Sequence, residues 1–152
     1  MSNGRADKAS NAWDAESIAA FVATFEAGRL PKALWTHEAH LVVATYYLWS
    51  ASPDESLRRL RKHIVKHNEA VGTPNDHESG YHETITRAWV AIVRDFLVRR
   101  RGGSIEDVLT ALLMSDAADA DTPLRFYSRE RLFSSAARAD RVTPDRQPLP
   151  GT

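Results

Sequence analysis

Apolar residues recur at intervals of three and four along most of this sequence, which is the spacing of one face of an α-helix. No stretch shows a convincing alternation of apolar and polar residues, the pattern of a half-buried β-strand. The clearest helical rows are Ile18–Phe21–Val22–Phe25, Leu57–Leu60–Ile64 and Ile85–Trp89–Ile92–Phe96. The periodicity therefore predicts an all-α protein.

Residues that begin and end helices divide this pattern into segments. Small polar residues cap helix N-termini, and glycines commonly end helices. These signals predict helices over about 14–27, 36–49, 52–71, 81–101, 104–114 and 128–139. Ser52 and Glu55 have the spacing of a capping box, with Pro53 at the first helical position. The segment 36–49 is apolar on most sides, so we expect it at the centre of the domain.

The length of 152 residues suits one domain. Residues 1–12 are polar and are expected to be disordered, and residues 13–140 contain all the predicted helices. Three prolines in residues 141–152 predict an extended C-terminal tail. We therefore expect a single-domain bundle of four to five helices joined by short loops.

Composition narrows the classes of function. The 20 basic and 20 acidic residues give no net charge, which argues against a nucleic-acid partner. The absence of cysteine excludes disulfides and thiolate metal sites. No apolar run approaches the roughly 18 residues of a membrane helix, and the first residues lack the apolar core of a signal peptide. We expect a cytoplasmic protein without a membrane partner, and the oligomeric state stays open.

Four of the six histidines occupy related positions in the predicted helices. His37 and His40 lie on the first turn of the second helix, His67 lies near the end of the third, and His82 begins the fourth. Helices joined by short loops are usually antiparallel neighbours, so these four side chains should meet at one end of the bundle. The same reasoning places Arg61 toward the opposite end.

Neutral imidazole is the commonest transition-metal ligand in proteins, and three histidines with an open position are a usual catalytic arrangement. The sequence therefore predicts a divalent transition metal, either Zn, Fe, Ni or Mn. The expected ligands are His37, His40 and His82, with His67 as a fourth ligand or a supporting partner.

Further polar residues border the predicted metal centre. Glu83 is the candidate carboxylate ligand or general base, and Tyr81 is the candidate substrate-facing residue at the catalytic centre. The loop 72–80 is expected to act as a lid. These residues suggest a small metal-dependent enzyme, a hydrolase or an oxygenase, that activates water or an oxygen-containing small molecule.

Two other classes of function fit the same residues. The first is a non-catalytic module that binds a metal or a small ligand, with the histidines donating hydrogen bonds to an acidic or aromatic molecule. The second is a structural or partner-binding helical protein whose histidines are incidental.

Two short motifs add a resemblance. Residues 35–41 read Trp-Thr-His-Glu-Ala-His-Leu, and residues 80–86 read Gly-Tyr-His-Glu-Thr-Ile-Thr. The chain resembles a small bacterial all-helical family of unassigned function that carries WTHxAHL and YHETxT segments. This resemblance implies that His37, His40, His82 and Glu83 act as a unit. A looser likeness to DinB-like metal-binding bundles is an architectural analogy only.

Overall fold

The computed structural model describes residues 13–100 and 102–151, and every regular element in those ranges is helical. The predicted all-α class is confirmed, whereas the expected disorder of residues 1–12 lies outside the described ranges. None of these helices is long and apolar enough to cross a membrane. The long helices are α2 (Ala15–Glu26), α3 (His37–Ser50), α4 (Pro53–Ala70), α5 (Glu83–Arg100) and α6 (Ile105–Leu113). The short elements are η1 (Lys32–Leu34), η2 (Asp116–Ala118), η3 (Thr122–Arg125), α7 (Arg129–Leu132) and α8 (Ser135–Ala139).

Polar side chains begin the long helices at the predicted places. The Thr36 hydroxyl accepts a hydrogen bond from the Ala39 amide at the start of α3. The Ser52 hydroxyl accepts one from the Glu55 amide at the start of α4. In a complete capping box the Glu55 side chain would also accept a hydrogen bond from the Ser52 amide. Here the Glu55 carboxylate instead binds Arg58 and Arg59 one turn later. Two guanidinium groups at helical spacing compete effectively for one carboxylate.

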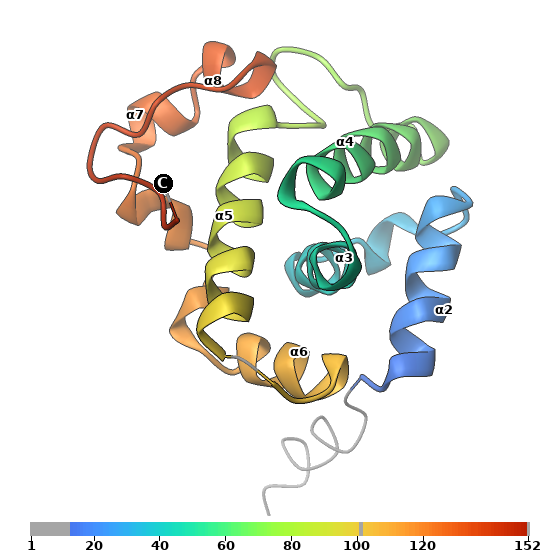
Figure 1. Cartoon of the computed structure of the whole chain (residues 1–152). Coiled ribbons are helices and arrows are strands. Elements are labelled where there is room, and N and C mark those ends of the chain that lie inside the picture. The colour runs from blue at the N-terminus through green and yellow to red at the C-terminus, as the bar shows by residue number, and fades with distance from the viewer. Residues whose placement is uncertain (1–12, 101, 152) are drawn as a thin grey trace, which may run out of the picture.

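Helix α3 lies at the centre of the domain, as its apolar sequence predicts. It contacts α2, α4, α5 and α6, which surround it in Figure 1. Val42 and Val43, which are adjacent in sequence and lie on different sides of the helix, are both fully buried. The core therefore forms around one helix and does not lie along a single seam between parallel helices.

The helices around α3 are steeply inclined to one another. In Figure 1, α3 is seen end-on while α4 runs across the view and α5 runs along it. The expected antiparallel pairing of consecutive helices is therefore wrong, because a core helix that is apolar all round lets its neighbours cross it on several sides. One consequence concerns Arg61, from the middle of α4. It reaches Glu83 at the start of α5, with 2.7 Å between Nη2 and Oε2, and does not lie at an opposite end.

The C-terminal segment packs against the outside of α5. The helix predicted over 128–139 is divided into α7 and α8, because the Ser134 hydroxyl accepts a hydrogen bond from the Ala137 amide and begins a new helix. Residues 140–151 form no helix, but they are held to the domain. The Tyr127 hydroxyl donates to the Val142 carbonyl at 2.8 Å. Leu149 is buried in an apolar cluster with Ala88 of α5, Tyr127 and Leu132.

Candidate functional site

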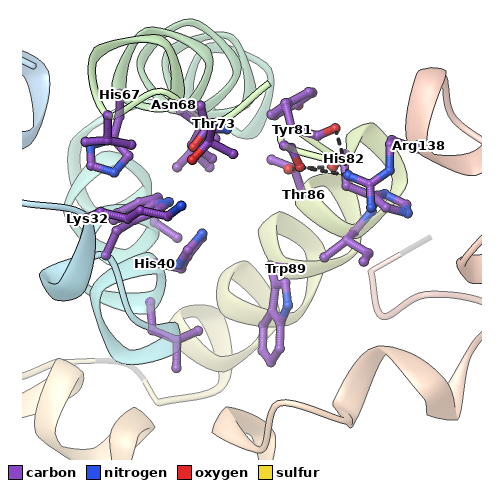
Figure 2. A pocket seen from close by; sticks show the side chains of 18 of the residues that line it. Lys32, His40, His67, Asn68, Thr73, Tyr81, His82, Thr86, Trp89 and Arg138 are labelled. Carbon is purple, nitrogen blue, oxygen red and sulfur yellow. Dashed lines mark hydrogen bonds between the residues drawn. The ribbon is translucent and has the colours of Figure 1, made fainter. Parts of the chain in front are cut away.

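A cavity of about 470 Å³ lies between α3, α4 and α5, and the connection 71–82 and the segment from α7 to α8 complete its walls. Figure 2 shows side chains from these separate elements pointing toward one space. Ligand pockets for small organic molecules have volumes of roughly 300–1,000 Å³. The walls are mainly apolar and include Trp35, Leu41, Ala44, Leu60, Ile64, Val71, Tyr81, Ile85, Trp89 and Phe133.

Trp35, which follows η1, forms a rigid part of this wall. One face of its indole is stacked on Phe25, with the ring centroids 4.4 Å apart and the planes at 14°. The His40 ring lies 3.8 Å from the indole centroid and the His67 ring lies 5.4 Å away. Trp35 therefore brings together His40 from the first turn of α3 and His67 from the last turn of α4.

His40 presents one unprotonated nitrogen to its surroundings. Its Nδ1 lies 2.7 Å from the Thr36 carbonyl oxygen, and only a protonated Nδ1 can donate to that oxygen. Nε2 of the neutral ring is then a hydrogen-bond acceptor, and it has no partner within the described ranges. Burial is the main cause that lowers the His40 pKa to about 4, so the ring is neutral at physiological pH.

His67 is fully buried, and its imidazole has no hydrogen-bond partner. Neither Nδ1 nor Nε2 has a donor or an acceptor within reach among the residues that the structure describes. Burial lowers the pKa of this ring, so it is neutral and carries one N–H and one lone pair. His67 borders the cavity, and its ring lies on the same side as Lys32 and His40 in Figure 2.

His82 also borders the cavity, but both of its nitrogens are engaged by the backbone. Nε2 donates to the Leu132 carbonyl at 2.8 Å, and Nδ1 accepts from the Ile85 amide at 3.0 Å. The ring thus caps the N-terminus of α5 and ties it to the end of α7. His37 lies 2.7 Å from the Ala118 carbonyl through its Nε2.

The four predicted metal ligands differ in how their nitrogens are engaged. His67 has no hydrogen-bond partner in the described ranges, and His37 and His40 each place one nitrogen at a backbone carbonyl. Both nitrogens of His82 are engaged by the backbone. Over residues 13–100 and 102–151, no group of three or more His, Asp or Glu side chains is placed to hold a metal ion. A metal bound through His82 Nδ1 would replace the Ile85 amide, while Nε2 could keep its hydrogen bond to the Leu132 carbonyl. The predicted centre stays a prediction.

The predicted catalytic carboxylate, Glu83, is only 5% exposed and is fully paired. Arg61 donates to both of its oxygens, Arg87 donates to Oε2, and the Tyr81 hydroxyl donates to Oε1 at 2.8 Å. Burial alone would raise the pKa of Glu83, but these three partners together lower it to about 2. A carboxylate with that pKa is a weak base, so the geometry favours a role in joining α4 to α5.

Tyr81, the predicted substrate-facing residue, lies at the cavity wall. Its ring lines the cavity, which agrees with a substrate-facing position, but its hydroxyl is directed to Glu83. Burial raises the pKa of this phenol, so it is protonated at neutral pH. Tyr81 therefore supplies an aromatic wall and holds the carboxylate.

The loop 72–80, the predicted lid, borders the cavity and is fastened to it. The side-chain oxygen of Asn75 accepts hydrogen bonds from the Asn68 side chain at 2.9 Å and from the Tyr81 amide at 3.0 Å. Gly80 has a φ of 80°, and a Cβ there would lie 2.2 Å from the Pro74 carbonyl oxygen. These contacts join the loop to α4 and to Tyr81, just before α5, and its role as a lid stays a prediction.

Two cationic residues of the cavity were not predicted. Lys32 reaches it from η1, and Arg138 reaches it from α8, on the other side of the view in Figure 2. Nη1 of Arg138 donates to the Gly80 carbonyl at 2.8 Å, which is a contact across 58 positions of sequence. No local pattern marks either residue, because their positions depend on how distant elements pack.

Comparison with known protein families, with curated proteins and with solved structures finds no match to this chain. The resemblance suggested by residues 35–41 and 80–86 therefore stays an expectation. In the structure, the first of these motifs supplies Trp35 and His40 to the cavity, and the second supplies Tyr81 and His82.

Proposed function

We propose that this protein binds a small organic molecule in the cavity between α3, α4 and α5. The volume, about 470 Å³, is that of a small-ligand site. Trp35 and Trp89 give it broad aromatic surfaces, and a few polar side chains lie among them. This combination of apolar walls with few polar groups is typical of sites that recognise a mainly apolar molecule by one or two hydrogen bonds.

The observation that carries the proposal is the unpaired imidazole of His67. A buried polar group without a partner costs about 1–3 kcal/mol, so most buried polar groups are hydrogen-bonded. Thr45, Ser56 and His63 also carry a buried atom without a partner in the described ranges, but of these four residues only His67 lines the cavity. The surroundings cover both nitrogens of His67, and Figure 2 shows the exposed Lys32 side chain beside the ring. A ligand that displaces this flexible side chain would give His67 its missing partner.

His40 adds chemical selectivity to the site. Its protonated Nδ1 is held by the Thr36 carbonyl, so Nε2 accepts a hydrogen bond and does not donate one. A ligand with an N–H or O–H group satisfies this nitrogen. Because the His40 ring stacks beside Trp35, the same ligand would place an apolar surface against the indole. The expected ligand therefore combines a flat apolar body with at least one hydrogen-bond donor.

The experiment is a fragment screen by NMR, with binding mapped on backbone amides and on the indole N–H signals. Thr86 lines the cavity and is only partly buried, so Thr86→Phe should fill the space. The matched control is Thr110→Phe on α6, a partly buried threonine away from the cavity. Fragments that bind the original and control proteins but not Thr86→Phe would support the proposal. Binding that persists in Thr86→Phe would contradict it.

A second candidate is the metal-dependent enzyme expected from the sequence, and one observation favours it. His40 and His67 are both neutral beside Trp35, and each has a nitrogen without a protein partner in the described ranges. Neutral imidazoles are good ligands for transition metals. Elemental analysis after reconstitution with Zn, Fe, Ni or Mn tests this candidate. Near-stoichiometric metal that is lost in His40→Ala and kept in His77→Ala would support it. Protein that retains no metal would contradict it.

A further inference from the structure

The charged side chains that line the cavity are cationic. Lys32 and Arg138 both line it, and none of its lining residues is Asp or Glu. The carboxylate behind Tyr81 is Glu83, which is already paired with the guanidinium groups of Arg61 and Arg87. Two cations therefore face a largely apolar space without compensating carboxylates. The low dielectric constant of apolar walls strengthens the positive electrostatic potential in such a cleft.

Arg138 uses only one of its three guanidinium nitrogens as a hydrogen-bond donor to the residues that the structure describes. Its Nη1 donates to the Gly80 carbonyl at 2.8 Å and more weakly to the Tyr81 carbonyl at 3.4 Å. Its Nη2 and Nε make no hydrogen bond to any residue that the structure describes, and no carboxylate in those ranges forms an ion pair with it. The backbone contact fixes the guanidinium at the wall while part of its planar fork remains free to bind an oxyanion.

We infer that the ligand of this cavity is an organic carboxylate whose anionic group binds Arg138 and whose apolar body extends toward Trp35. The inference rests on the proposed small-molecule binding and names the chemical class of the ligand. Arg138 suits the anion better than the opposite side of the cavity, because the lone pair on His40 Nε2 repels negative charge. Lys32 adds a favourable field from that side without a required contact.

A carboxylate fits these surroundings better than a phosphate. Phosphate sites usually combine several free backbone amides at a helix N-terminus with more than one basic group. Here the Ile85 amide near the start of α5 is already taken by His82 Nδ1. The two cations lie on different sides of the space in Figure 2, and apolar side chains lie between them. A single planar carboxylate that binds the Arg138 guanidinium fits this arrangement.

The test uses matched compounds with the same flat apolar body and the same hydrogen-bond donor, namely hydroxy- and amino-substituted aryl carboxylates, their primary amides and their phosphonates. Affinities are measured by NMR titration of the full-length protein. We expect each carboxylate that binds to be preferred over its amide by roughly tenfold, since hydrogen bonds to charged groups contribute more than neutral ones.

Three arginine variants and one lysine variant locate the anion. Arg138→Gln should remove the preference for the acid, whereas Arg125→Gln, at an exposed position with the same change in charge, should keep it. Arg138→Lys should restore part of the preference. Because Arg138 also holds the Gly80 backbone, Lys32→Gln provides a variant at an exposed site, and we expect it to reduce the preference by about twofold to threefold.

Each other outcome has a definite meaning. Equal affinity for acids and amides, with binding still abolished in Thr86→Phe, would overturn the anion inference and leave the proposed function standing. Tighter binding of the phosphonates would overturn the assignment to a carboxylate. An acid preference that survives in a folded Arg138→Gln protein would overturn the role of Arg138. Failure of every compound to bind in a Thr86→Phe-sensitive manner would overturn both proposals.

Discussion

Replacing His67 with Phe should stabilise the ligand-free protein, although the side chain is fully buried in the core. The imidazole holds one N–H and one lone pair without partners, and each such group costs about 1–3 kcal/mol. A phenyl ring removes both and can pack among Phe25 and Trp35, whose centroids lie 5.8 and 5.4 Å from the His67 ring. The ring is slightly larger, and overpacking offsets part of the gain, about 1–3 kcal/mol. We expect a net stabilisation of about 1 kcal/mol.

The matched control is the same substitution at His82, which also lines the cavity and is 8% exposed. Here both nitrogens are bonded, so His82→Phe loses two hydrogen bonds. It also leaves the Leu132 carbonyl and the Ile85 amide without their partner. The expected cost is about 2–4 kcal/mol, opposite in sign to the effect at His67. Urea unfolding at pH 7.5, followed by tryptophan fluorescence and circular dichroism, measures both.

The comparison has a clear refutation. If His67→Phe loses as much stability as His82→Phe, the imidazole of His67 is satisfied in solution, and the premise of the proposed function fails. If His67→Phe is more stable and still binds the compounds that Thr86→Phe excludes, the ring does not contact the ligand. Gain of stability together with loss of binding is the result that the structure predicts.

Three further predictions concern the surroundings of the cavity. Glu83→Gln should lower the free energy of unfolding at pH 7 by about 2 kcal/mol, less than the fall in pKa from 4.5 to about 2 implies, because Arg61 and Arg87 are partly exposed. In the original protein this contribution to the free energy of unfolding should be lost as pH falls from 4.5 toward 2. A Glu106→Gln control keeps Glu83, so urea unfolding should show the same loss with pH in that variant. His40→Gln should lessen the loss of stability between pH 6.5 and 4, because the lowered pKa of His40 makes the folded state disfavour its protonation. Gly80→Ala should destabilise the protein by more than 1 kcal/mol in thermal unfolding, since φ is positive and the new methyl meets the Pro74 carbonyl. Gly72→Ala is the control, because φ is also positive there but the methyl enters open space, so it should cost less.

The parts of the fold that the sequence could predict depend on neighbours within one helix. Thr36 and Ser52 cap α3 and α4 through amides three residues ahead, so a short window contains both partners. The central position of α3 was also predictable, because an apolar surface on all sides requires surrounding elements. Ser134 was a missed signal of the same local kind, since it could have indicated the break between α7 and α8.

The candidate site was harder to predict because its contacts join distant parts of the chain. His67 was correctly placed on a buried face, but its proximity to His40 depends on Trp35 lying between α3 and α4. His82 was also placed on a buried face, and nothing near it in sequence shows that its Nε2 is directed to the Leu132 carbonyl, 50 positions away. A histidine pattern predicts which rings are inside, but not which nitrogens remain free.

The zero net charge shows why a count over the whole chain says little about this cavity. The carboxylate behind Tyr81 is used locally, because Glu83 pairs with Arg61 and Arg87. Lys32 and Arg138 are left at the wall without an acidic partner in the described ranges. A balanced composition argues against a strongly basic surface, and this stays a prediction. It could not exclude a small positive cavity, because recognition of one anion depends on how charges are distributed and paired at short range.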